Sequence, residues 1–263
     1  MFVVAHLGPF AVLLVHFSWR VVAIAIASYL VRMWGLTAGY HRYFSHRSFK
    51  TGRVFQFVLA WLGASAFQNG PLWWASWHRA HHRHSDIDGD AHSPVLRGFW
   101  YAQLGWYYSG KHMRADTRNV ADLARYPELC FIERFAWLPP LTFAFACFAA
   151  GGWAGLAWGF GLSTILVLHC VGLINSLGHL RGSRPYETGD GSRNNALLAA
   201  ITLGDGWHNN HHHCMASARH GFRWWQLDPT YWSLRLLESF GVVRDLRMPT
   251  AKQLLREHQP LVG

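Results

Sequence analysis

The sequence predicts an all-α integral membrane protein in which four transmembrane helices, arranged as two hairpins, lie under a helical cytosolic cap. Composition gives the first indication, because 51% of the 263 residues are hydrophobic and 16% are aromatic. Only 14% are charged, against about 25% in soluble domains. The second indication is that the apolar residues gather in separate runs. A chain of this length fits one domain, residues 1–263.

Four apolar runs are expected to form the membrane spans. They cover residues of about 3–17, 20–38, 135–150 and 153–174. A signal peptide is the alternative for the first run, but the run lacks a basic start and a small-residue cleavage site. Gly151 and Gly152 should form the turn of the second hairpin. Arg32 should reach the headgroup level, because a charge is costly inside a bilayer, and Pro139 and Pro140 should kink the third span.

The cap is expected to comprise residues 41–130 and 175–263. Its loops are rich in arginine, so the positive-inside rule places the cap in the cytoplasm and accounts for the net charge of +10. Residues 54–67 form a short apolar stretch that we expect to lie at the membrane interface or to be re-entrant, and not to span the bilayer. The four cysteines show no paired spacing and should be reduced. Nucleic acid is not an expected partner, because no basic helix stands apart from the hydrophobic runs.

Half of the 18 histidines fall into four clusters, each following an apolar run. The clusters are His41 and His46; His78, His81 and His82; His179, preceded by Asn175; and His208, His211 and His212. Because residues at i, i+3 and i+4 share a helical face, each three-membered cluster can converge on a metal site. His41 and His46 are separated by roughly 140° on an α-helix. They can share a site only if the helix ends between them; otherwise they serve different metals.

Nine imidazoles exceed the capacity of one metal ion and suit two ions with four or five ligands each. Isolated histidines such as His16 and His169 are more simply packed or interfacial residues. His213, His84 and His92 also look non-ligating by their spacing, with a supporting role left open for the last two. Asp86, Asp88 and Asp90 alternate as in a calcium loop, but the terminal Glu of such a loop is missing. We expect this acidic loop to orient the second cluster or to pair with nearby arginines.

The motifs around these clusters resemble those of the membrane fatty acid desaturases, in particular the stearoyl-CoA (Δ9 acyl-CoA) desaturase branch. The matching segments cover most of the chain from residue 34 onward. They are GLTAGYHRYFSHRSFK, WHRAHHRHSDIDGDAHSP, NSLGH, GSRPYETGDGSRNN and GDGWHNNHHHCMASARHGFRWWQLD. The resemblance implies a mushroom-like fold of four helices under a cytosolic cap that holds a di-iron site facing the cytoplasm.

The resemblance also assigns the site residues. The two iron ions (Fe2+/Fe3+) would be bound by His41, His46, His78, His81, His82, His179, His208, His211 and His212, and Asn175 would act through a metal-bound water. The implied reaction is the introduction of a cis double bond, at Δ9, into a long-chain fatty acyl substrate, with acyl-CoA as the favoured carrier. Animal enzymes carry a charged pair before the second cluster, where this chain has Ser76 and Trp77. An acyl-lipid or acyl-carrier-protein substrate therefore stays open.

The chemistry of such a reaction requires a redox-active metal, which favours iron over zinc. Dioxygen, the co-substrate, takes up four electrons to become two waters. Two of these come from the acyl chain, and two must come from a separate donor, either a ferredoxin or a cytochrome b5-type protein with its reductase. The expected partners are therefore a long-chain acyl substrate, this donor and membrane lipid.

Four residues are candidates for the substrate tunnel. Tyr29 and Met33 are spaced i, i+4 on the second span, two to three turns before His41. Related acyl-CoA enzymes close their tunnel in this region, so we expect the two side chains at its far end. The alternative is that they pack against another span or lipid. Trp74 and Trp207, each close to a histidine cluster, are the aromatic candidates for the tunnel wall.

Three rival functions would use a similar set of residues. A hydroxylase or ketolase on the same scaffold differs only after the first hydrogen abstraction, so the spacing separates it poorly. A non-catalytic metal transporter would need ligands along the spans near the bilayer midplane, whereas these histidines gather at one surface. A zinc hydrolase would need an H-E-x-x-H motif, which is absent.

Overall fold

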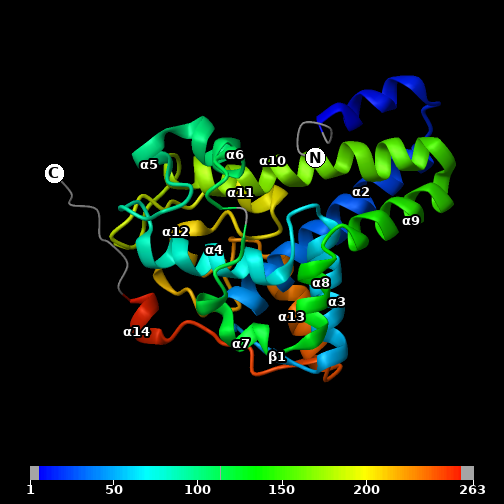
Figure 1. The fold of residues 1–263 in the computed structure, drawn as a ribbon. Helices are drawn as coiled ribbons and strands as arrows, with labels where there is room; N and C mark the ends of the chain where they lie inside the picture. The colour runs from blue at the N-terminus through cyan, green and yellow to red at the C-terminus, as the bar shows by residue number, and fades with distance from the viewer. Residues whose placement is uncertain (1–5, 113, 256–263) are drawn as a thin grey trace.

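The structure is a computed structural model that describes residues 6–112 and 114–255. These residues form a helical molecule with one small antiparallel sheet, in which Lys50 pairs with Arg244 and Thr51 with Val243 (Figure 1). The α-helices are α2 (Trp19–Trp34), α3 (Arg53–Ser65), α4 (Pro71–His84), α5 (Pro94–Arg97), α6 (Trp106–Tyr108), α7 (Ala121–Ala124), α8 (Pro127–Arg134), α9 (Leu138–Gly155), α10 (Ser163–Ser176), α11 (Ala196–Ile201), α12 (His208–His213), α13 (Pro229–Ser239) and α14 (Ala251–Leu254). The strands are β1 (Lys50–Thr51) and β2 (Val243–Arg244).

Helical segments of other types continue or connect these α-helices. The 3-10 helices are η1 (Gly8–Leu14), η4 (Thr117–Val120) and η6 (Leu177–His179), and the π-helices are η2 (Gly35–Ser45), η3 (Tyr101–Gly105) and η5 (Leu156–Leu162). In a π-helix the N–H of residue i+5 bonds to the carbonyl of residue i. The helical content agrees with the all-α prediction.

Two helices in the described part of the chain are long and apolar enough to cross a membrane, Trp19–Ser45 and Leu138–His179. The second folds back on itself at Gly151 and Gly152, where the backbone leaves helical geometry and Gly152 has a φ of 60°. The expected glycine turn is therefore present. Its arms pack so closely that a Cβ on Gly155 would lie 2.3 Å from the carbonyl oxygen of Cys147. Figure 1 shows this hairpin and α2 projecting together from the rest of the molecule.

The N-terminal region differs from the predicted first hairpin. Part of the expected span at residues 3–17 lies outside the described residues, and within them Gly8–Leu14 forms a 3-10 helix of 7 residues. At about 2.0 Å per residue, this segment is too short for a hydrocarbon core of about 30 Å. The Ser18 side chain caps the start of α2 by accepting a hydrogen bond from the Val21 N–H. The described residues thus contain one long hairpin and one long helix that follows a short 3-10 segment.

Arg32, which was expected at the headgroup level, is fully buried within the protein. Its guanidinium donates hydrogen bonds to Thr164 Oγ1 (2.6 Å), to the Gly159 carbonyl (3.3 Å) and to Ser163 Oγ. Oxygen atoms of the second long helix therefore replace water around the charge. Pro139 and Pro140 do not kink α9, because they lie in its first turn, where the backbone N–H groups need no helical acceptor.

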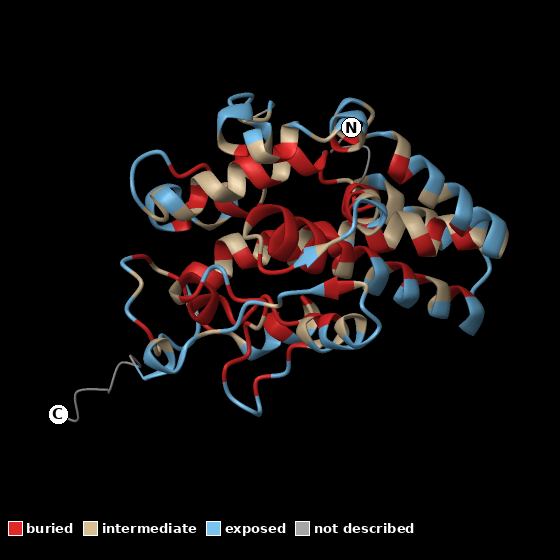
Figure 2. Cartoon of the chain, turned by 90° about the horizontal axis from the view of Figure 1, so that it is seen from below, coloured by how far each residue is buried: buried red, intermediate tan, exposed pale blue. Residues whose placement is uncertain are grey.

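The π-helix η2 lies at the centre of the fold, and all its residues are buried. Helix α3 packs closely on it, since a Cβ on Gly35 would lie 2.7 Å from the carbonyl carbon of Leu62. Helix α3 covers most of the stretch expected at the membrane interface and is not one of the two long apolar helices. Figure 2 shows buried residues concentrated in the central part of the molecule, whereas the long helices turn exposed faces outward. These outward faces carry large apolar residues such as Ile26, Leu30 and Phe145.

Helix α4 is fixed at its start by a carboxylate from another helix. Glu133 of α8 accepts hydrogen bonds from the backbone N–H groups of Leu72 (2.9 Å) and Trp73 (3.1 Å). These two groups belong to the first turn, which has no helical acceptors of its own. The contact holds the helix that carries the second histidine cluster against α8.

Candidate metal centre

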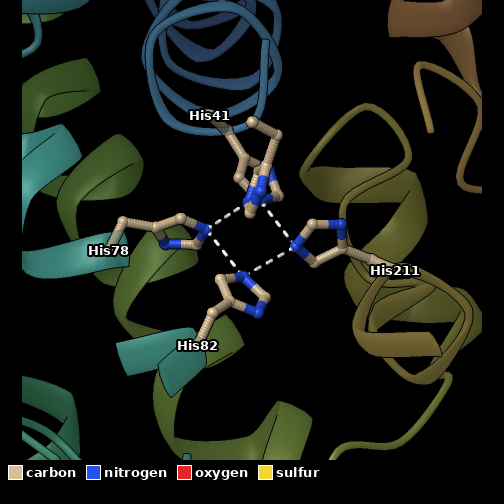
Figure 3. Close-up of side chains that lie close together, drawn as sticks. His41, His78, His82 and His211 are labelled. Carbon is tan, nitrogen blue, oxygen red and sulfur yellow. Dashed lines mark hydrogen bonds between the residues drawn. The ribbon is translucent and has the colours of Figure 1, made fainter. Parts of the chain in front are cut away.

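Five buried or half-buried histidines from three parts of the chain form the first of two groups. They are His41 and His46 at the end of η2, His78 and His82 on α4, and His211 on α12. Their ring Nε2 atoms face one another, at 3.0 Å between His41 and His211, 2.9 Å between His78 and His82, and 3.0 Å between His82 and His211 (Figure 3). His46 joins them at 2.8 Å from His78. We call this set the five-histidine group.

The π geometry of η2 explains why His41 and His46 lie in the same group. The His46 N–H bonds to the His41 carbonyl at 3.2 Å, so one wide turn brings the two residues to the same side. Their ring centroids are 5.0 Å apart. The helix ends at Ser45, between the two histidines, as the first sequence-based alternative required. The second alternative, in which they serve different metals, does not match the grouping, because both lie in the five-histidine group.

The remaining four clustered histidines form a second group. His81 from α4, His179 from η6, and His208 and His212 from α12 are all buried, and their ring nitrogens lie within 4.8 Å of one another. The Nε2 atoms of His179 and His208 are 3.0 Å apart. We call this set the four-histidine group. It adjoins the first, because the ring centroids of His82 and His212 are only 4.4 Å apart.

Each three-membered cluster is divided between the two groups instead of converging on one site. On α4, His78 and His82 belong to the five-histidine group and His81 to the four-histidine group. On α12, His211 belongs to the five-histidine group and His208 and His212 to the four-histidine group. Neighbouring residues of an α-helix point roughly 100° apart, so His81 and His82 cannot face the same point. Residues i and i+4 stay together on one face.

Four carboxylates orient the imidazoles of these groups. The Nδ1 atoms of His41, His81, His179 and His212 bond to Asp205 (2.7 Å), Asp90 (3.0 Å), Asp86 (2.8 Å) and Asp190 (2.7 Å), respectively. A proton held on Nδ1 by a carboxylate leaves the Nε2 lone pair free to bind a metal. The acidic loop therefore orients one residue of the second cluster, His81, and also His179 from another cluster.

Burial keeps four of these imidazoles neutral. It lowers the pKa of His78, His82, His208 and His211 well below 6.5, and the neighbouring histidines lower it further. The neutral imidazole is the form that binds a metal ion. Burial alone would raise the pKa of the Asp205 carboxyl, but His41, His220 and Arg42 hold that pKa well below its usual value. Asp205 is therefore an anion at neutral pH.

A buried ionic network supports Asp205. Arg42 is fully buried and contacts Asp205 Oδ1 at 3.0 Å and Asp228 Oδ1 at 2.9 Å. His220 Nδ1 lies 3.2 Å from Asp205 Oδ1. Sequence reasoning missed Asp190, Asp205 and His220. The two aspartates could have been found from their sequence context, because each lies in a Gly-Asp-Gly motif near a histidine cluster.

Asp122 connects the two chain segments that carry the first and second histidine clusters. It pairs with Arg47, which follows His46, at 3.0 Å from Nε, and with Arg79, which follows His78, at 2.8 Å from Nη1. Partial burial acts to raise the pKa of Asp122, but hydrogen bonds from the two arginines lower it to about 2. Arg79 also donates to the Phe44 carbonyl at 2.7 Å. These contacts tie η2 to α4 on the side away from the histidine rings.

Two adjoining cavities open beside the histidine groups. One, of about 420 Å³, extends from Leu36 and Thr37 past His41 and His208. The other, of about 320 Å³, lies among the aromatic residues Trp73, Trp77, Trp106 and Tyr107 and also touches His92. The two share Trp74, His78, Val171 and Asn175 along their walls. Both cavities therefore adjoin histidines of the two groups.

Only one of the four proposed tunnel residues lines the cavities. Trp74 lines both cavities, whereas Tyr29, Met33 and Trp207 line neither. Met33 is fully buried in the main core, and it precedes Thr37 by one helical turn. The Tyr29 hydroxyl donates to the Ile201 carbonyl. Trp207 donates from Nε1 to the Leu227 carbonyl at 2.8 Å.

Histidines outside the two groups have other contacts. His169 lies 3.2 Å from His6 through their Nε2 atoms. His213 bonds to the Gln253 carbonyl at 3.0 Å, and its ring stacks on Tyr186. His84 bonds to the Ala80 carbonyl at 3.0 Å.

The chain is similar in sequence to known proteins. The family model for fatty acid desaturases matches residues 17–243. The chain is 38% identical over 260 residues to the palmitoyl-monogalactosyldiacylglycerol delta-7 desaturase of Arabidopsis thaliana, with 97% of this chain and 68% of the relative covered. It is 37% identical over 253 residues to the sn-1 stearoyl-lipid 9-desaturase of Anabaena variabilis (94% and 92% covered). It is 38% identical over 238 residues to the acyl-CoA C20 Delta5-desaturase of Anemone leveillei (89% and 76% covered). Two histidine groups beside a cavity agree with these matches, and the chain belongs to the fatty acid desaturase family.

Proposed function

We propose that this chain is an O2-dependent di-iron desaturase that introduces a cis double bond, at Δ9, into a long-chain fatty acyl group. The observation that carries the proposal is the convergence of nine imidazoles in two adjacent groups beside a cavity. The matches to desaturases acting on acyl chains support the reaction class. A hydroxylase on the same scaffold is the alternative that product analysis must separate.

The five-histidine group would hold one iron and the four-histidine group the other, with Asn175 completing the second site through a water. The donor set fits iron, because neutral imidazole is a suitable ligand for it. Nε2 atoms only 2.8–3.0 Å apart leave several lone pairs facing one another, and the buried Nε2 of His212 has no hydrogen-bond partner. When bound, the irons would supply the oxidising power that activates dioxygen and removes hydrogen from a methylene.

The protein's own residues would then orient the metal-binding imidazoles and enclose the acyl chain. The four carboxylates hold the Nδ1 protons of their histidines, which keeps the Nε2 atoms directed at the centre. The aromatic wall, with Trp74 at its middle, would exclude water from the acyl chain. Electrons would come from a separate ferredoxin or cytochrome b5-type protein.

We further propose a multi-pass membrane protein with the site facing the cytoplasm. The histidine groups lie at the ends of both long apolar helices, since His41 is close to the end of Trp19–Ser45 and His179 ends Leu138–His179. Trp19 at the start of α2 and Trp153 at the tip of the long hairpin are 79% and 71% exposed. Exposed aromatic residues of this kind are expected at a membrane interface. The arginine-rich loops lie on the side of the histidines.

The proposal is tested by expression in a host that lacks the Δ9 double bond, with lipid analysis and metal analysis of the purified protein. We expect a new cis monoene and about two irons per chain. A hydroxylated product would favour the alternative. One iron per chain, or zinc that supports turnover, would contradict the di-iron assignment.

The carrier of the acyl group is the point on which the relatives differ. The motif resemblance favours acyl-CoA, and two of the relatives are named for that substrate. Others are named for acyl groups on lipids. Acyl-CoA and glycerolipid are therefore the two candidates.

Chain-length selection gives a further prediction for this site. Met33 lies one turn beyond Leu36 and Thr37, which line the inner end of the larger cavity. Met33→Ala is expected to deepen that end by the space of about two to three methylenes. Tyr29→Ala should act similarly from one turn further. Product profiles from cells fed acids of different lengths should show a gain on longer chains with the double bond at an unchanged distance from the carboxyl carbon. Unchanged profiles for both variants, at normal protein levels, would place the end of the tunnel elsewhere.

A further inference from the structure

Two histidines that belong to neither group lie against one candidate ligand of each. His92 and His220 are buried, at 4% and 0% exposure. The ring centroid of His92 is 4.4 Å from that of His81, with an angle of 33° between the ring planes. The ring centroid of His220 is 4.5 Å from that of His211, with an angle of 38°. The four-histidine group and the five-histidine group therefore each have an additional imidazole in a similar arrangement.

His220 is also fastened to the carboxylate that orients another member of the five-histidine group. Its Nδ1 lies 3.2 Å from Oδ1 of Asp205, while Oδ2 of the same carboxylate holds Nδ1 of His41 at 2.7 Å. The His220 carbonyl accepts a hydrogen bond from Asn210 Nδ2 at 2.8 Å. His220 is thus held both by a carboxylate and by the residue that precedes His211.

The position of His220 matters most for His211. Four other members of the two groups bond through Nδ1 to an aspartate, whereas the buried Nδ1 of His211 has no hydrogen-bond partner in the described part of the chain. The ring of His211 also contacts those of His41, His46 and His82, at 4.3, 4.6 and 4.8 Å. These three are candidate ligands themselves, so the ring of His220 supplies a support from outside the group.

His92 has the corresponding place at the four-histidine group. Its backbone N–H donates to Asp90 Oδ1 at 3.1 Å, and the same carboxylate holds Nδ1 of His81 at 3.0 Å. Its ring also contacts that of Trp106, at 5.0 Å between centroids. His92 and His81 are therefore joined twice, through one carboxylate and through their rings.

Packing alone does not account for an imidazole at either place. Within the residues that the structure describes, the buried Nδ1 of His92 and the buried Nε2 of His220 have no hydrogen-bond partner. Buried polar atoms of folded proteins are generally hydrogen-bonded. An apolar side chain would fill the same space without leaving such an atom unpaired.

We propose that His92 and His220 are positioning residues, one for each iron of the proposed di-iron site. His92 fixes the direction of the His81 ring, and His220 fixes that of the His211 ring. Neither residue binds a metal ion itself. Outer partners of this kind set the orientation of metal-bound histidines and thereby the strength of metal binding. The inference rests on the proposed function, and it requires that each of the two residues acts on a different iron.

The test is Mössbauer spectroscopy of the purified full-length protein loaded with isotopically enriched iron. Sets of five and four histidines give the two irons different surroundings, so two quadrupole doublets are expected for the wild type. His92→Leu should change one doublet and His220→Leu the other, and the double variant should change both. Leucine removes the ring but keeps a side chain of similar size.

Iron release to a chelator provides a second readout. Each leucine variant should lose iron about 10-fold faster than the wild type, the lower end of the range for outer partners of metal ligands. His84→Leu is the matched control, because His84 lies outside both groups and bonds to the Ala80 carbonyl at 3.0 Å. It should leave both doublets and the release rate unchanged.

The inference is overturned if His92→Leu and His220→Leu change the same doublet, or if either variant leaves both doublets as in the wild type. A change of both doublets by one single variant would show a general loss of structure and would overturn it as well. His92→Gln and His220→Gln also remove the ring, and they replace a leucine variant that fails to fold. Wild-type protein that takes up no iron would instead contradict the proposed di-iron function itself.

Discussion

His211→Ala is expected to abolish desaturation and to lower the iron content of the purified protein. His211 is fully buried, and its Nε2 faces those of His41 and His82 at 3.0 Å each. Its loss leaves the five-histidine group with a gap at its centre. Because loss of an outer partner of a metal ligand already costs about 10- to 100-fold in affinity or activity, removal of a ligand should exceed that range. Product analysis and metal analysis of the same preparation measure both effects.

A histidine two positions along the chain, His213, offers a matched control. His213 lies on the same short helix but bonds to the Gln253 carbonyl and stacks on Tyr186. His213→Ala should keep most activity and iron, as should His16→Ala in the N-terminal region. Wild-type activity in His211→Ala, or equal losses in His211→Ala and His213→Ala, would show that the five-histidine group is not the metal site.

Asp205→Asn is expected to lower activity by about 10- to 100-fold, the range found for outer partners of metal-bound histidines. An amide cannot hold the His41 Nδ1 proton and compensate Arg42 as the carboxylate does. The fold should persist, because Arg42 keeps Asp228 at 2.9 Å. The decisive measurement is iron affinity by competition with a chelator, which should fall together with activity.

Asp88→Asn is the control for Asp205→Asn, since Asp88 is an exposed member of the acidic loop. It should leave iron affinity unchanged. If Asp205→Asn lost thermal stability but retained wild-type iron affinity, the role of Asp205 would be to support the fold, and the histidine-orienting role would be rejected.

The sequence predicts the histidine groups well, because the information lies in local spacing. An i, i+4 pair such as His78 and His82 must share a face on any α-helix. The division of each cluster depends on how α4 and α12 cross, which is a tertiary property. The π geometry of η2 was equally hidden, since no residue pattern distinguishes it from an α-helix here. The burial of Arg32 is hidden from the sequence for the same reason: its acceptors Thr164 and Gly159 come from a helix more than a hundred residues away.

The division of α4 and α12 between both histidine groups has a consequence for metal loading. Each of these rigid helices presents ligands to two centres at once, as His81 and His82 do from adjacent positions. An ion that fixes His78 and His82 also fixes the direction of His81, and so reduces the conformational freedom that the second ion must remove. Occupancy of the two centres is thereby thermodynamically coupled. Iron uptake should be cooperative, with singly loaded protein scarce at every stage of the titration.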